Sequence, residues 1–243
     1  MNTLKLERDS ELAGLATITL NRPEKLNAIN SQMHAELQAV CAELRGDSAT
    51  RVVIVTGAGR AFSAGADLTD RALAPGGSVL ESRRLAGTGN VTAAALEGLD
   101  QVTIGAVNGL AVGGAVVFLA CLDLRLAAES AWFSIPEIDL HIPLTWNALP
   151  RLMRELGPAR TRELVMTGDR FTAQQALQWG LVNHLFQEDA LLGQARALAA
   201  KLLKKDPLSL ALTKSTTRAL ANLMVPIDAT HSDREYLLFA SRS

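Results

Sequence analysis

Residues 103–127 of the chain read TIGAVNGLAVGGAVVFLACLDLRLA, with no charged side chain before Asp123. An uncharged apolar run of this kind approaches the length of a membrane span. Two dipeptides interrupt the run: Asn108-Gly109 and Gly113-Gly114. Asn-Gly is a strong turn signal. We therefore interpret the stretch as a buried strand, a loop and a buried helix, rather than as a membrane span.

The start of that helix raises a question of its own. Glycine costs roughly 1 kcal/mol relative to alanine inside a helix, yet two glycines stand where this helix begins. The turn that follows, Ala115 to Phe118, has no polar side chain. Helix stability alone therefore does not explain the residues chosen here.

Short apolar strands alternate with helical patterns on both sides of this stretch. Strands are expected at 4–8, 16–20, 51–57, 103–107, 125–128 and 132–135. One helix is expected between an N-cap at Asn30-Ser31 and a stop at Gly46, and a capping box at Thr172 opens another that Gly180 closes. Further helices are expected at 81–99, from 114, and at 190–204, 208–220 and 227–239. The alternation predicts an α/β fold, with a core domain at 1–189 and a C-terminal helical region at 190–243.

Composition excludes several function classes. The chain has 243 residues, 48% hydrophobic and 20% charged, with a net charge of −1. It therefore has no basic footprint for nucleic acid and no polybasic patch for a membrane surface. The N-terminus has no apolar signal segment, and Cys41 and Cys121 lie in apolar helical patterns, which predicts buried free thiols in the cytoplasm.

The stretch VIVTGAGRAFSAG (53–65) suggests a dinucleotide-binding loop and thus a dehydrogenase. Gly57 and Gly59 fit the fingerprint, but Phe62 occupies its third glycine position. The strand before it is not the first of the chain, and the single tyrosine, Tyr236, has no lysine four residues later. These departures argue against NAD binding.

Two glycine-rich segments, AFSAGADL (61–68) and NGLAVGG (108–114), each follow a buried strand. Small residues let a ligand approach the backbone closely, and one N–H from each loop would form an oxyanion hole. Taken by themselves, the glycines are explained better as tight turns between strand and helix.

The chain resembles the crotonase superfamily, the enoyl-CoA hydratase/isomerase family. The resemblance rests on motifs that occur in the same order along most of the chain. They are NRPEKLNAI (21–29), AFSAGADL, AVNGLAVGG (106–114), IPEIDLHIP (135–143), LPRLMRELGPAR and FTAQQALQWGLVN. It implies a ββα spiral core with a C-terminal helical layer, an acyl-CoA thioester substrate, and a homotrimer or a hexamer built as a dimer of trimers. Coenzyme A is part of the substrate, so neither a separate cofactor nor a metal is expected.

Carried over to this sequence, the resemblance places the oxyanion hole at the backbone N–H groups of Ala66 and Gly114. Gly113, the first glycine of the Gly113-Gly114 pair, is expected to contact the substrate. The residues expected to line the coenzyme A channel are Lys25, Leu26, Ala28, Ala64, Asp67 and Leu68. Asp67 has an alternative role as a helix cap. Lys214 matches a basic group near the coenzyme A phosphates, with a solvated helix charge as the alternative.

Hydratases of this family use two glutamates to add water across a double bond. Glu137 matches the second of them, but Val117 occupies the first position. A site with one carboxylate and an apolar residue at the second position resembles the Δ3-Δ2-enoyl-CoA isomerase pattern. In that reaction a single base moves a proton from C2 to C4, and an apolar site excludes competing water. Isomerase activity is therefore expected ahead of hydratase or another crotonase reaction. The alternative of a different class is a CoA-ester-binding protein without catalysis.

Two further departures concern the segment after Glu137. His141 and Asn147 stand where relatives usually have glycine. If the segment is extended, Glu137, Asp139 and His141 share one face, because side chains alternate along a strand. Asp139 or His141 would then supply a second acid/base group.

Overall fold

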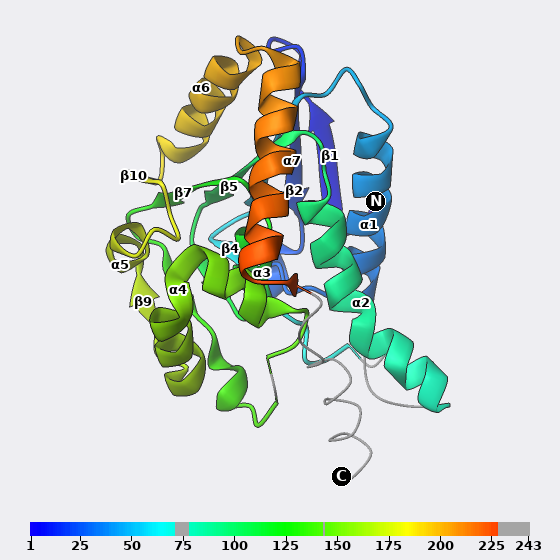
Figure 1. The fold of residues 1–243 in the computed structure, drawn as a ribbon, viewed down its shortest axis with the longest axis vertical. Coiled ribbons are helices and arrows are strands. Elements are labelled where there is room, and N and C mark those ends of the chain that lie inside the picture. Colours follow the sequence, from blue (N-terminus) through cyan, green and yellow to red (C-terminus); the bar gives the residue numbers. More distant parts are fainter. Residues whose placement is uncertain (71–77, 143, 228–243) are drawn as a thin grey trace.

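A computed structural model describes residues 1–70, 78–142 and 144–227. Its largest element is a sheet of six strands in the order β1-β2-β3-β5-β7-β10 (Figure 1). β1 is antiparallel to β2, and the remaining neighbours are parallel. The strands are β1 (Leu4–Arg8), β2 (Leu15–Leu20), β3 (Val52–Gly57), β5 (Val102–Val107), β7 (Leu124–Ala128) and β10 (His184–Phe186). All residues of β3 and β5 are buried, as expected for parallel strands covered on both faces.

A second, smaller sheet has the order β4-β6-β8-β9. β4, β6 and β8 are parallel neighbours, and β9 is antiparallel to β8. The strands are β4 (Ala61–Ser63), β6 (Leu110–Val112), β8 (Trp132–Ser134) and β9 (Phe171–Thr172). β4 and β6 lie inside the two glycine-rich segments, where the sequence indicated only loops.

The chain repeatedly forms one strand of the large sheet, then one strand of the small sheet, and then a helix. β3 and β4 precede α2 (Val79–Glu97), and β5 and β6 precede α3 (Gly114–Ala120). β7 and β8 precede the short 3-10 helix η3 (Pro136–Ile138). This recurring ββα order confirms the predicted α/β fold and its spiral core.

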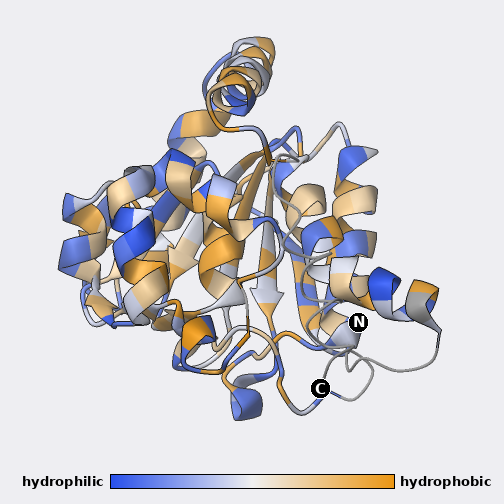
Figure 2. Ribbon diagram, turned by 60° about the horizontal axis from the view of Figure 1, so that its bottom comes forward, coloured by the Kyte–Doolittle hydropathy of each residue, from blue (hydrophilic) through white to orange (hydrophobic). Residues whose placement is uncertain are grey.

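Capping residues and hydrophobic periodicity in the sequence predicted several helices close to their observed bounds. α1 (Ser31–Arg45) has Asn30 as its N-cap, whose side chain accepts a hydrogen bond from the N–H of Met33, and Gly46 as its C-cap. The capping box of Thr172 and Gln175 opens α5 (Ala173–Gln178). α6 (Leu191–Leu203) and α7 (Pro207–Met224) lie close to their predicted ranges. Figure 2 shows that the helices carry hydrophobic residues beside hydrophilic ones.

One helix was not predicted from the sequence, and two predictions are not tested by the structure. α4 (Ala148–Thr167) is a long helix interrupted at Gly157, where φ is 73° and Pro158 follows. The predicted helix at 227–239 lies outside the described residues from 228 onward. The division into a core at 1–189 and a C-terminal region at 190–243 stays a prediction.

Two observations concern the cysteines and the lengths of the helices. Cys41 and Cys121 are buried free thiols. Among the helices of the described ranges, none has the length and apolar character needed to cross a bilayer.

Asn27 joins the loop after β2 to the turn between β3 and β4. Its buried Nδ2 donates to the carbonyl oxygens of Ala58 (2.9 Å) and Ala61 (2.8 Å), and its Oδ1 accepts from the N–H of Arg22 (2.9 Å). Its own carbonyl oxygen accepts from the Ser63 hydroxyl at 2.8 Å. These contacts hold the loop at 21–29 beside β4.

We expect Asn27→Ala to lower the free energy of unfolding by about 2 kcal/mol, because the substitution leaves buried carbonyl and N–H groups without partners. Chemical denaturation measures the loss. The exposed Asn2→Ala variant serves as the matched control and should change stability by less than about 0.5 kcal/mol. Equal stability of the two variants would contradict this role for Asn27.

Candidate active site

The candidate site lies where three neighbouring strands end. β4, β6 and β8 run parallel in one sheet, so their carboxyl ends meet at one edge. Gly65 and Ala66 follow β4, Gly113 and Gly114 follow β6, and Glu137 follows β8. The topology therefore brings together the three segments that the sequence indicated separately.

The first two of these segments are in backbone contact at Gly65. A Cβ atom at Gly65 would lie 2.4 Å from the carbonyl oxygen of Val112 and 3.3 Å from the backbone nitrogen of Gly114. Gly65 also has a φ of +82°, which side chains rarely adopt. Only glycine allows the two loops to approach this closely.

The N–H groups of Ala66 and Gly114 are both available. Ile29 forms a parallel bridge beside Ala66, in which its N–H donates to Gly65 O (2.7 Å) and its O accepts from the N–H of Asp67 (2.9 Å). The N–H of Ala66 therefore faces away from Ile29, and Gly114 is the first residue of α3, where N–H groups have no partner within the helix. Among the described residues, neither N–H has a hydrogen-bond partner. Two N–H groups without partners, on loops that are in contact at Gly65, are consistent with the predicted oxyanion hole, which stays a prediction.

Glu137 reaches the site through Gly113. The N–H of Gly113 donates to the carbonyl oxygen of Ser134 at 2.9 Å, which holds the end of β6 against β8. A Cβ atom at Gly113 would lie only 2.5 Å from Glu137 Oε1. The carboxyl group thus packs directly on the glycine that precedes Gly114, whose N–H is the predicted oxyanion donor.

The environment of this carboxyl group is apolar. Glu137 Oε2 is buried, and no hydrogen-bond partner contacts it within the described residues. Burial raises the pKa of Glu137 to about 7. A group with this pKa exchanges a proton readily near neutral pH, as general acid/base catalysis requires.

The first turn of α3 carries two apolar residues of interest. Phe118 lies on the same side of the helix as Gly114, because the two are four residues apart, and Val117 is the position expected for a second glutamate. Val117 is 1% exposed and carries no group that could orient water. The position expected for a second glutamate is therefore apolar and closed.

The segments expected to line the coenzyme A channel lie together. The N–H of Ala64 donates to Leu26 O at 2.9 Å, so the loop at 21–29 runs beside the segment that carries Ala66. Lys25 and Leu68 are exposed, and Ala28 is half-buried. This placement is consistent with a channel leading to the two N–H groups, and the channel itself stays a prediction.

Asp67 does not cap a helix within the described residues. Its Oδ1 accepts from the N–H (3.0 Å) and the hydroxyl (2.6 Å) of Thr69, and its Oδ2 accepts from Arg22 Nη1 at 2.8 Å. The hydrogen bond from the Thr69 hydroxyl, together with that from Arg22, lowers the pKa of Asp67. Arg22 also donates to Ala28 O at 2.6 Å, so this ion pair ties the loop at 21–29 to the residues after Ala66.

Neither expectation for Lys214 fits the structure. Its Nζ donates to Asp123 Oδ2 and to Gln101 O, both at 2.7 Å, and its side chain is 9% exposed. Burial lowers the pKa of Lys214, while Asp123 counteracts this effect. Gln101 and Asp123 lie just before β5 and β7, at the opposite end of these strands from the glycine turns. Lys214 is therefore a buried structural cation and is neither a solvated charge nor a phosphate contact in this chain.

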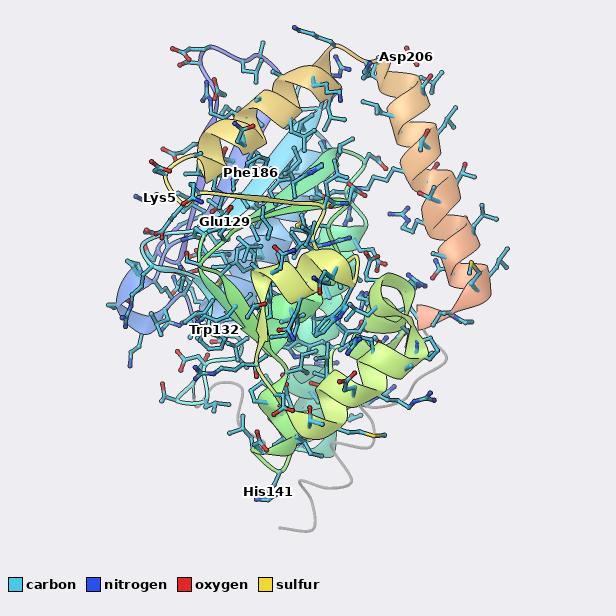
Figure 3. All side chains as sticks on the ribbon, turned by 90° about the vertical axis from the view of Figure 1, so that its left-hand side faces the viewer. Lys5, Glu129, Trp132, His141, Phe186 and Asp206 are labelled. Atoms are coloured by element: carbon cyan, nitrogen blue, oxygen red, sulfur yellow. The ribbon has the colours of Figure 1, made fainter. Side chains whose placement is uncertain are left out.

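The segment after Glu137 is not extended, so the condition for a shared face of Glu137, Asp139 and His141 is not met. Residues 136–138 form the 3-10 helix η3, and the N–H of Leu140 and of Ile142 both bond to Glu137 O at 3.1 Å. Asp139 is exposed and points to Gly168, where a Cβ atom would lie 2.7 Å from its Oδ2. His141 projects outward at the end of the molecule (Figure 3). A compact turn does not alternate its side chains, so neither residue joins Glu137.

The two positions at which the resemblance implies glycine share one backbone conformation. His141 has a φ of +56° and Asn147 a φ of +48°. Histidine and asparagine are among the residues that tolerate this left-handed region best. The substitutions therefore keep the turn that glycine would make, without adding a catalytic group.

Sequence reasoning missed the aromatic side chains around α3. Trp146, Phe118 and His34 form a cluster, and burial lowers the pKa of His34 to about 4, so that this ring is neutral at pH 7. His34 and Phe118 occur in apolar helical patterns, but no local signal in the sequence places Trp146 against them.

Comparison with known proteins agrees with this geometry. A sequence model of the family described as enoyl-CoA hydratase/isomerase matches residues 10–239. The short-chain-enoyl-CoA hydratase of Clostridium acetobutylicum is 34% identical over 215 residues, which are 88% of this chain and 80% of that protein. The crystal structure of an enoyl-CoA hydratase from Bacillus anthracis has a TM-score of 0.84 at 31% identity and covers 99% of this chain and 90% of that chain. The crystal structure of a monofunctional enoyl CoA isomerase from M. smegmatis has a TM-score of 0.77 at 29% identity. It covers 96% of this chain and 98% of that chain.

The raised pKa of Glu137 predicts a pH dependence of stability. The folded protein binds the proton of this carboxyl more tightly than the unfolded chain does, so the stabilisation is complete below the unfolded pKa of 4.5. It is lost as the pH rises toward 7. Relative to Glu137→Gln, the wild type should therefore lose up to about 3 kcal/mol of stability across this interval.

Denaturant titrations at a series of pH values measure this difference. Glu129→Gln, at an exposed glutamate in the turn after β7, is the matched control and should follow the wild type (Figure 3). Parallel pH profiles of the wild type and Glu137→Gln would show that the Glu137 carboxyl has an ordinary pKa.

Proposed function

Because this chain belongs to the enoyl-CoA hydratase/isomerase family, the crotonase superfamily, we propose that it acts on enoyl-CoA thioesters and that its reaction is Δ3-Δ2 isomerisation. The observation that carries the choice of isomerisation is the single carboxylate. Glu137 packs on Gly113, and the closed apolar Val117 occupies the position of a second glutamate.

The proposed reaction begins with the thioester carbonyl oxygen at the N–H groups of Ala66 and Gly114. The Glu137 carboxylate removes a proton from C2, and the electron pair moves onto the thioester oxygen to give a dienolate. The two N–H groups stabilise that negative charge. The protonated Glu137 then returns its proton at C4, and the double bond forms between C2 and C3. One proton leaves and one returns, so no water is consumed.

Apolar surroundings support this proposal. Water at Glu137 would compete for the proton before it reached C4. Within the described residues the buried Oε2 of Glu137 has no hydrogen-bond partner, and the closed side chain of Val117 carries no polar group that could hold water. Hydration remains the second candidate, because the relative in Clostridium acetobutylicum is named as a hydratase.

We expect purified protein to convert hex-3-enoyl-CoA to the conjugated hex-2-enoyl-CoA, measured by the absorbance of the conjugated thioester. Glu137→Gln should lower kcat/KM by about a thousandfold, because it removes the only proposed base. Glu129→Gln should retain full activity.

The same assay with hex-2-enoyl-CoA in water tests hydration. Efficient loss of its conjugated absorbance, with little conversion of the 3-enoyl thioester, would replace isomerase by hydratase. Binding of both thioesters without turnover of either would favour a CoA-ester-binding protein without catalysis.

We further propose that copies of this chain assemble through α7 as a homotrimer or a hexamer. α7 lies at the side of the molecule (Figure 3), and apart from the paired side chain of Lys214 its residues are half-buried or exposed. Large apolar side chains are exposed on one side of it: Leu208, Leu212, Leu220, Leu223 and Met224. Exposed apolar patches of this kind mark protein interfaces.

We expect light scattering after size exclusion to give the mass of three or six chains for the wild type. The double variant Leu212→Glu/Leu223→Glu should reduce it to that of one chain, because an interface does not accommodate unpaired charges. Leu68→Glu, at an exposed leucine far along the chain from α7, is the control. A wild type that is monomeric at micromolar concentration would refute the proposal.

A further inference from the structure

The indole ring of Trp146 covers the glycine that presents the second oxyanion N–H. A Cβ atom at Gly114 would lie 2.2 Å from Trp146 Cζ3 and 2.4 Å from its Cη2. On the other side, a Cβ atom at Gly89 in α2 would lie 1.9 Å from Trp146 Nε1. The ring thus lies against the backbone of α2 and of α3, at points where glycine alone leaves room for it.

Two further rings hold this indole in place. Phe118, one helical turn beyond Gly114, stacks on Trp146 with centroids 5.2 Å apart and an interplanar angle of 27°. The buried His34 meets Trp146 edge to face at 5.1 Å, and its Nδ1 lies 2.9 Å from the Thr92 hydroxyl oxygen. Aromatic pairs in these geometries attract one another beyond simple burial. The cluster therefore fixes the position of the indole.

The backbone of Trp146 supports the same conclusion. Its φ is +62°, a left-handed conformation that is uncommon for a bulky residue, and Asn147 follows with a φ of +48°. Such conformations persist only where surrounding structure holds them, and they concentrate at functional sites. The strain is consistent with a side chain whose position is constrained by function.

The path of the substrate leads toward this ring. The residues expected to line the coenzyme A channel lie on the Ala66 side of the site, next to the loop at 21–29. In the proposed reaction the carbonyl is held at Gly114, and C2 to C4 lie near Glu137, which packs on Gly113. Carbons beyond C4 that continue away from the channel along α3 would meet the stacked rings of Phe118 and Trp146. A ring seated on Gly114 shortens the space available to them.

We propose that Trp146 is a specificity-determining residue that forms the end wall of the acyl pocket and restricts this protein to short-chain acyl thioesters. The proposal rests on the proposed function for the direction of the acyl chain. It assigns the residue that sets chain length, which neither the single carboxylate nor the oxyanion hole determines.

The test compares two chain lengths in the isomerase assay. Wild type should use hex-3-enoyl-CoA with a kcat/KM at least about tenfold above that for dodec-3-enoyl-CoA, since pocket contacts discriminate by such factors. Trp146→Ala should raise kcat/KM for the long substrate about tenfold while lowering that for the short one. Trp146→Leu, which keeps an apolar side chain in the cluster, covers the case in which the alanine variant does not fold.

Trp179→Ala is the matched control. Trp179 packs on Phe171 and Arg160, away from α3, so its removal should leave the ratio between the two substrates unchanged. Equal use of both substrates by the wild type would overturn the proposal. So would an unchanged ratio in folded Trp146→Ala and Trp146→Leu.

A binding measurement separates this proposal from the proposed function. Calorimetry with saturated hexanoyl-CoA and dodecanoyl-CoA requires no turnover. Absence of isomerisation, together with stronger dodecanoyl-CoA binding by Trp146→Ala than by wild type, would reject the isomerase and keep the role of Trp146. Identical binding of dodecanoyl-CoA by the wild type and both Trp146 variants would reject that role.

Discussion

The candidate site depends on one backbone contact, between Gly65 after β4 and the last residue of β6. A Cβ atom at Gly65 would meet the carbonyl oxygen of Val112 at 2.4 Å. The small sheet brings β4, β6 and β8 into parallel register, and this contact determines how closely their following loops approach. A wider separation would leave Ala66 and Gly114 too far apart to serve one oxygen atom, whatever side chains surrounded them.

The rest of the structure maintains that approach. Asn27 and Arg22 tie the loop at 21–29 to β4 and to Asp67, which positions the outer side of the site. On the inner side, Gly113 bonds to β8 and leaves space for the Glu137 carboxyl. In the proposed reaction, the backbone N–H groups of Ala66 and Gly114 stabilise negative charge and the buried Glu137 side chain transfers the proton. This division explains why the first turn of α3 contains no polar residue.

Burial determines the chemistry of the titratable groups in different ways. Glu137 has no partner for its buried oxygen and its pKa rises to about 7, so it remains able to exchange a proton. Lys214 is also buried, but its pairing with Asp123 and Gln101 gives it a structural role. Within the described residues, Lys214 is thus fixed by its partners, whereas Glu137 Oε2 has none.

The sequence by itself determined the α/β class, the caps of α1 and α5, the two glycine-rich loops and the absence of a second glutamate at Val117. These features are local, because periodicity, capping and residue identity are read within a few positions. Only the tertiary structure decided that 136–142 forms a turn, that Lys214 faces Asp123, and that Trp146 rests on Gly89 and Gly114. The contacts of Lys214 and Trp146 join residues far apart in the chain, whereas the turn at 136–142 is held by hydrogen bonds within that segment. Long-range contacts follow from the path of the backbone, which local pattern does not specify.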